Sequence, residues 1–137
     1  MKIPGLRSDF DKVGGLVFFG RMLDKIRLHA QGKLPSDYNR GTGYDGRVCR
    51  FLKVEYAKLV ERVLQGGKDD EILEWCFTGG RKPGEEELLI FNAFLTKRGW
   101  RDETSEALAQ LKRARGFGNR DDIQTFSDFH RADEESD

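Results

Sequence analysis

Apolar positions recur along most of the chain at the spacing of α-helices, and no useful length alternates with a period of two. The first helix is expected to open at Gly14-Gly15 and to end near Gln31-Gly32, because glycine is common just after a helix. We therefore predict an all-α fold without a sheet. It is a single compact bundle, irregular or orthogonal, of about six to seven short-to-medium helices. The later helices are expected at about residues 45–54, 55–65, 69–79, 85–98, 102–115 and 121–129.

One helical domain is expected to occupy residues 1–137, a length that can bury a substantial core without disulfides. Residues 1–13 are predicted to form an irregular N-terminal arm, and residues 131–137 a frayed acidic tail. Charged residues make up 35% of the chain and apolar residues 37%, which is typical of a globular protein. The chain has no run of about 18 apolar residues and no apolar stretch at its N-terminus, so we expect a cytoplasmic protein without membrane contact.

Charges are separated along the chain although the formal net charge is zero. Residues 1–53 contain 11 Lys and Arg against 5 Asp and Glu, whereas residues 121–137 contain 1 against 7. This polarity predicts that the acidic C-terminal segment docks on the basic N-terminal half, either within one chain or between two chains. Nucleic acid is not an expected partner, because it would compete with the protein's own acidic segment.

Three charged side chains interrupt the first predicted helix, whose other positions are mostly apolar. Arg21, Asp24 and Lys25 lie opposite the main apolar stripe, but apolar residues lie among them. We expect such a helix to be covered on both sides, and an enclosed charge needs a partner because stranding it costs roughly 3–5 kcal/mol. Arg21 and Asp24 can pair on the helix itself, whereas Lys25 needs Asp45, a C-terminal acid or a bound anion. The cluster is then a structural ion-pair network, a ligand pocket or a contact between subunits.

A glycine-rich loop, GTGYDG at residues 41–46, precedes the second predicted helix. Its GxGxxG spacing is not a dinucleotide-binding fingerprint, because no strand precedes it. The loop can instead offer backbone N–H groups to an anion around Gly43, with Asp45 as the N-cap of the helix. Arg47 and Arg50 follow closely and would add positive charge. The alternative is a flexible loop with surface arginines.

Metal and cofactor binding are not predicted. The chain has two histidines, His29 and His130, and two cysteines, Cys49 and Cys76, and their spacing matches no zinc site. Both cysteines have apolar neighbours and are expected to be buried thiols rather than disulfide partners. His29 is expected to be a packed or capping residue near the end of its helix, since a general base would need a carboxylate or nucleophile within hydrogen-bond distance.

Several segments together resemble a small bacterial family of unknown function. The resemblance covers nearly the whole chain, and RMLDK in the first predicted helix is its most distinctive part. It implies a free-standing cytosolic bacterial protein of this length and assigns no activity, so no catalytic residue follows from it. The segments are GGLVFFGRMLDKIRLHAQGKLP at 14–35, DGRVCRFL at 45–52, DDEILEWCF at 69–77, KRGWRDE at 97–103 and RDDIQTFSDF at 120–129.

Two functions agree with these features. The first is a non-enzymatic binding or interaction domain that forms a homodimer through the first predicted helix or the acidic C-terminal helix. The alternative is a site for a small anion or a phosphorylated metabolite, in a binding protein or an enzyme, where the first helix meets the glycine-rich loop. Its residues would be Arg21, Asp24, Lys25, Gly43, Asp45, Arg47 and Arg50.

Overall fold

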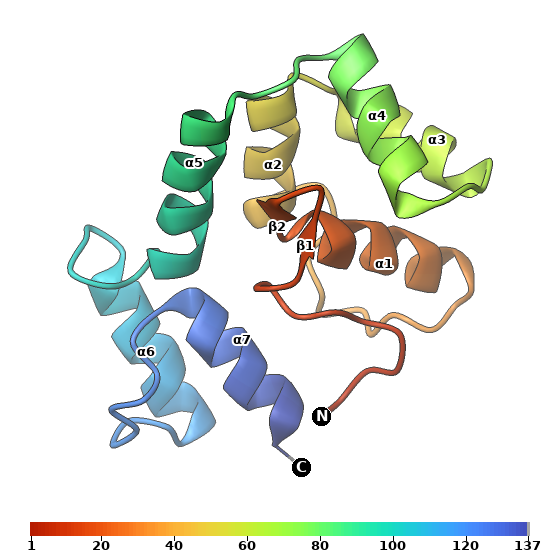
Figure 1. Ribbon diagram of the computed structural model, residues 1–137. Coiled ribbons are helices and arrows are strands. Elements are labelled where there is room, and N and C mark those ends of the chain that lie inside the picture. The colour runs from red at the N-terminus through yellow and green to blue at the C-terminus, as the bar shows by residue number, and fades with distance from the viewer. Residues whose placement is uncertain (137) are drawn as a thin grey trace.

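Seven helices and one short hairpin make up residues 1–136, the part of the chain described by the computed structural model (Figure 1). Longer loops, residues 31–43 and 116–125, precede α2 and α7, and shorter loops connect the other helices. The predicted all-α fold class is confirmed. The hairpin consists of β1 (Lys12–Val13) and β2 (Leu16–Val17). The helices are α1 (Phe19–Ala30), α2 (Tyr44–Leu52), α3 (Tyr56–Leu64), α4 (Asp69–Gly79), α5 (Glu85–Lys97), α6 (Ser105–Arg115) and α7 (Phe126–Glu135).

The small hairpin corrects the prediction that the chain contains no sheet. Gly14 and Gly15 do not open a helix; they form the two-residue turn between antiparallel β1 and β2. Their φ angles are +56° and +81°, and a turn with two positive φ angles matches the twist of the strands it joins. Glycine adopts such angles without steric cost. The first helix therefore begins only at Phe19.

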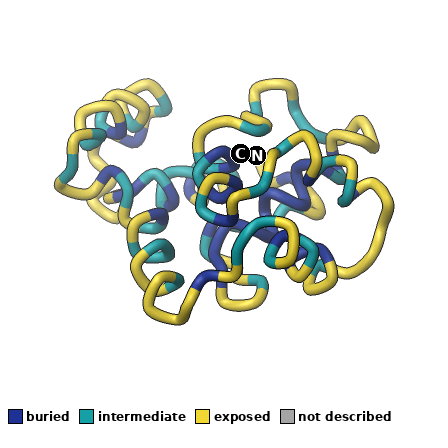
Figure 2. The backbone as a smooth tube through the Cα atoms, turned by 90° about the horizontal axis from the view of Figure 1, so that it is seen from above, coloured by how far each residue is buried: buried dark blue, intermediate teal, exposed yellow. Residues whose placement is uncertain are grey.

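Helix α1 lies at the centre of the fold. Nine of its 12 residues are buried, and they contact the hairpin and several helices rather than one neighbour. Figure 2 shows the buried backbone gathered in the interior, with exposed loops around it. Cys49 and Cys76 lie in this core as free buried thiols, as predicted. The main core includes Leu16, Phe19, Met22, Leu23, Val48, Leu52, Leu59, Ile72 and Leu95.

Helices α6 and α7 pack side by side around a second, smaller apolar cluster (Figure 1). The last helix begins five residues later than predicted, because Thr125 caps it and accepts a hydrogen bond from the backbone N–H of Asp128 at 3.0 Å. Ile123 therefore precedes the helix and is buried against Phe117 and Ala132. Within residues 1–136, no helix is both long enough and apolar enough to cross a bilayer.

The structure also corrects the expectation of a frayed acidic tail. Residues 131–135 continue α7 to Glu135, and only Asp137 lies outside the described part of the chain. The segment is held because Met1 donates its N-terminal ammonium to the carbonyl oxygen of Asp133 at 2.8 Å, and Arg115 pairs with the Asp133 carboxylate at 2.6 Å. The two ends of the chain therefore meet.

Candidate functional site

The three charged side chains of α1 that were expected to be enclosed are buried. Arg21, Asp24 and Lys25 are 4%, 8% and 5% exposed. They do not pair with one another, which corrects the expectation of an Arg21–Asp24 pair on the helix. Asp24 instead accepts three hydrogen bonds of 2.9 to 3.0 Å from the side chain and backbone of Arg7, in the N-terminal arm.

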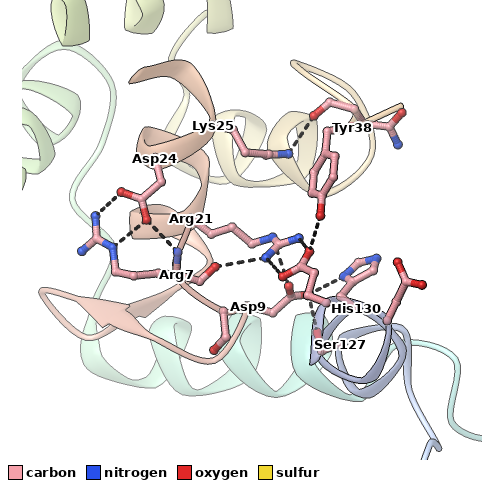
Figure 3. A network of polar contacts seen from close by, with 12 residues as sticks. Arg7, Asp9, Arg21, Asp24, Lys25, Tyr38, Ser127 and His130 are labelled. Carbon is pink, nitrogen blue, oxygen red and sulfur yellow. Dashed lines mark hydrogen bonds and ion pairs between the residues drawn. The ribbon is translucent and has the colours of Figure 1, made fainter. Parts of the chain in front are cut away.

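Arg21 joins the first helix to the last one (Figure 3). Its guanidinium donates two hydrogen bonds to the carboxylate of Glu134, at 2.9 and 2.6 Å, and a third to the carbonyl oxygen of Arg7 at 3.0 Å. Tyr38 donates to the same carboxylate at 3.0 Å. The acidic C-terminal helix therefore docks on the basic N-terminal half within one chain, which was one of the two predicted alternatives.

Asp9 forms the second contact between the N-terminal arm and α7. It is 2% exposed, and its Oδ2 atom lies 2.8 Å from both the Ser127 hydroxyl and Nδ1 of His130 (Figure 3). Burial alone would raise the pKa of Asp9, but the hydrogen bonds from His130 and Ser127 and the charge of Arg21 together hold it below its usual value. An ionised Asp9 accepts a hydrogen bond from Nδ1 of His130, which fixes the orientation of the imidazole ring.

Lys25 pairs with Asp45, one of its predicted partners. The Nζ atom lies 2.9 Å from Oδ1 of Asp45, which is 0% exposed, and donates to the carbonyl oxygen of Asn39 at 2.8 Å. Burial lowers the pKa of Lys25 more than Asp45 raises it, and burial raises the pKa of Asp45 more than Lys25 lowers it. Both pKa values are thus shifted toward the neutral forms, because burial removes both charges from water.

The loop before α2 differs from its prediction in one detail. Gly43, not Asp45, is the N-cap, with φ of +58° and ψ of −127°, angles suited to glycine. Asp45 lies in the first turn and accepts a hydrogen bond from the backbone N–H of Gly41 at 2.9 Å. The side chain therefore holds the loop closed over the start of α2 while it also binds Lys25.

A pocket of about 490 Å³ opens where α1, the loop before α2, the end of α5 and α7 meet. Four of the seven predicted site residues line it, namely Arg21, Lys25, Gly43 and Arg47. Asp24, Asp45 and Arg50 do not; the first two hold neighbouring side chains, and Arg50 is exposed. The remaining lining residues are Phe18, Asp37, Tyr38, Asn39, Thr42, Tyr44, Arg98, Thr104, Leu111, Phe126, His130, Asp133 and Glu134.

Arg47 differs from the other cations of the pocket. Arg21, Lys25 and Arg98 each form an ion pair with a carboxylate, whereas Arg47 forms none within residues 1–136. Its guanidinium instead lies 5.1 Å from the ring centroid of Phe94. An arginine without a carboxylate at the wall of a pocket keeps its hydrogen-bond donors available to a ligand.

Two aromatic residues of the pocket wall are energetically unfavourable, one in its backbone conformation and the other in its unpaired hydroxyl. Phe18 has a φ of +68°, which is rare for a bulky residue, and its ring packs edge-on against Tyr44 at 5.3 Å. The hydroxyl of Tyr44 is buried and forms no hydrogen bond in the described part of the chain. Burial also raises the pKa of Tyr44, so the hydroxyl keeps its proton and can donate it. Buried donors without a partner are few in native proteins, so this hydroxyl needs an explanation.

Sequence reasoning missed His130, Asp9, Tyr44 and Arg98. Asp9 and His130 lie 121 positions apart, so no spacing rule connects them. His29 lies in the last turn of α1, as predicted, but it is exposed rather than packed. The glycine-rich loop before α2 was the available signal, because Thr42, Gly43 and Tyr44 line the pocket.

The chain matches a known protein family. A family model described as a domain of unknown function (DUF5069) matches residues 3–136. No curated protein matches the chain. Among residues 1–136, no three His, Cys, Asp or Glu side chains are grouped as a metal ion would require.

Proposed function

The chain belongs to the DUF5069 family, whose description assigns no activity, and we propose that it binds a small anionic metabolite in the pocket between α1, α2 and α7. The proposal covers phosphorylated and carboxylated compounds. The volume of about 490 Å³ falls within the range of small-molecule sites, and aromatic side chains form part of the wall.

The observation that carries this proposal is the position of Arg47. It is the cation of the pocket without a carboxylate partner among residues 1–136, and the adjoining Tyr44 hydroxyl is a buried donor without an acceptor. Both residues follow Gly43 at the start of α2, where the first backbone N–H groups of a helix attract negative charge. Arg47 and the backbone N–H groups at the start of α2 therefore supply donors beside the same pocket.

Acidic residues of the same pocket narrow the ligand class. Asp37 and Asp133 also line it, and their carboxylates repel a ligand that is negative throughout. They accept hydrogen bonds from hydroxyl or amino groups. We therefore favour a compound with one anionic group near Arg47 and hydrogen-bond donors at its other end.

Self-association through α1 or α7 is less well supported than this pocket. Nine residues of α1 are buried by the chain itself, and α7 uses Glu134 and His130 to bind α1 and the N-terminal arm. The faces that would have formed such an interface are therefore occupied within the monomer.

Proton transfer to the bound ligand is a second candidate function, and the Asp9–His130 contact favours it. His130 lines the pocket, and its Nδ1 atom is held by a buried carboxylate that fixes the ring and leaves Nε2 as the base. Turnover of p-nitrophenyl phosphate or p-nitrophenyl acetate that disappears in His130→Asn would support it. Equal background hydrolysis by both proteins would count against it.

Thermal unfolding in the presence of simple anions tests the binding proposal. Inorganic phosphate, pyrophosphate and succinate are each titrated, with sodium chloride at equal ionic strength as the control for general salt effects. We expect a saturable rise in Tm with at least one of them, because a ligand that binds only the folded state stabilises it. Shifts no larger than those in sodium chloride for all three would contradict the proposal.

A further inference from the structure

Helix α5 exposes an apolar face that the chain leaves uncovered. Leu89, Ile90 and Phe94 are 71%, 64% and 41% exposed, although they belong to a well-formed helix of 13 residues. The opposite side of α5 faces the protein, where Leu95 is buried and Phe91 stacks on Phe51 at 4.0 Å. The helix forms one edge of the molecule in Figure 1.

Beyond the first turn of α5, its exposed positions and the half-buried Ala93 follow a single stripe. Glu86, Leu89, Ile90, Ala93, Phe94 and Lys97 are separated by steps of three and one, the spacing that keeps residues on one side of a helix. Charged residues stand at the two ends of the stripe, and apolar residues stand between them. Neither Glu86 nor Lys97 forms an ion pair within residues 1–136, whereas the neighbouring Glu87 pairs with Arg81.

The stripe on α5 is complementary to the same stripe on a second, antiparallel α5 helix. Its positions are symmetric about the midpoint between residues 91 and 92, so an antiparallel copy places Glu86 opposite Lys97 at both ends. The same arrangement places Leu89 opposite Phe94 and Ile90 opposite Ala93. A two-fold contact needs this property, because the same patch must fit itself on both subunits. Antiparallel helices also bring opposite ends of their dipoles together.

We propose that a second copy of this chain docks on the exposed face of α5, which yields a two-fold symmetric dimer with antiparallel α5 helices. This interface differs from the α1 and α7 interfaces expected from the sequence, and it adjoins the pocket at Phe94, whose ring centroid lies 5.1 Å from the Arg47 guanidinium. Small Ala93 at the centre lets the two helices approach closely. The flanking Leu89, Ile90 and Phe94 then lose contact with water, which supplies the main driving force.

The dimer is expected to be weak and reversible. A helix of 13 residues is about 20 Å long, and one pair of such helices covers less surface than the roughly 1,600 Å² of a standard interface. We therefore expect a dissociation constant of about 1 µM or weaker.

Sedimentation velocity from low micromolar to several hundred micromolar protein tests the proposal. Wild-type protein should shift from monomer to dimer across this range. Glu86→Lys should lower the association constant by about tenfold or more, because it converts two attractive contacts per dimer into two repulsive ones. The double variant Glu86→Lys/Lys97→Glu restores opposite charges and should recover the wild-type constant.

Glu85→Lys is the matched control, since it makes the same charge change one residue away and outside the stripe. It should dimerise like the wild type, and circular dichroism should show the same helical content for all four proteins. A wild type that stays monomeric throughout would overturn the proposal. So would a dimer that responds equally to Glu85→Lys and Glu86→Lys, or one that the double variant fails to restore.

Discussion

The Nζ atom of Lys25 lies 2.9 Å from Oδ1 of Asp45, and both side chains are enclosed by the protein. Two buried charges stabilise a fold only when their attraction exceeds the cost of removing them from water. The pKa of Lys25 is lowered and that of Asp45 raised, chiefly by burial, so we expect the pair to add little net stability.

Replacing Lys25 and Asp45, singly and together, should show how much the pair contributes to the free energy of unfolding. Lys25→Met or Asp45→Leu alone strands the remaining charge and should lower the free energy of unfolding by about 3–5 kcal/mol. Lys25→Met/Asp45→Leu removes both charges and should lose only about 1–2 kcal/mol, mainly from the unmatched N–H of Gly41. Urea unfolding followed by circular dichroism measures all three. A double variant at least as unstable as either single variant would show that the pair stabilises the fold.

Asp9 should make stability depend on pH on the acid side. Its folded pKa lies below the usual value of about 3.9, so its contribution is complete above that value and is lost as pH falls through the folded pKa. Asp9→Asn should therefore be less stable than the wild type at pH 7, and the difference should narrow below about pH 4.

Urea unfolding at several pH values checks this expectation. Asp121→Asn is the control, because Asp121 is exposed and should give no such pH-dependent gap. A gap between wild type and Asp9→Asn that stays constant down to pH 3 would contradict the assigned role of the carboxylate.

Glu134 should attach the last helix to the first one. Glu134→Gln weakens both hydrogen bonds to the buried Arg21 guanidinium and should lower the free energy of unfolding by about 1–3 kcal/mol. Glu135→Gln removes the same charge from an exposed neighbour and should change stability by less than about 0.5 kcal/mol. Equal losses in both variants would mean that the C-terminal charge, rather than this contact, holds α7.

The pattern of apolar positions predicted the enclosure of the α1 charges correctly, because Arg21, Asp24 and Lys25 lie on a helix with apolar residues on both sides. The same pattern did not predict the hairpin, because strands of two residues are too short to show alternation of apolar and polar positions. Only Gly14-Gly15 pointed to it, and glycine is equally consistent with a loop before a helix.

The start of α7 was predicted wrongly for a different reason. Ile123, Phe126 and Phe129 have helical spacing, yet Ile123 precedes the helix. The local signal was Thr125 followed by Asp128, a pattern that caps a helix. The Asp9–His130 contact had no local signal, because it depends on how the two ends of the chain meet in the fold.

Calorimetric titration of the most stabilising anion into Arg47→Gln and Arg50→Gln tests the central claim most directly. Both variants lose one arginine from α2, but Arg47 lines the pocket and Arg50 is exposed outside it. We expect Arg47→Gln to weaken binding by about tenfold or more, since a charge-assisted hydrogen bond contributes about 1.5–3 kcal/mol, and Arg50→Gln to bind like the wild type. Equal affinities for the two variants would contradict an anion site in this pocket.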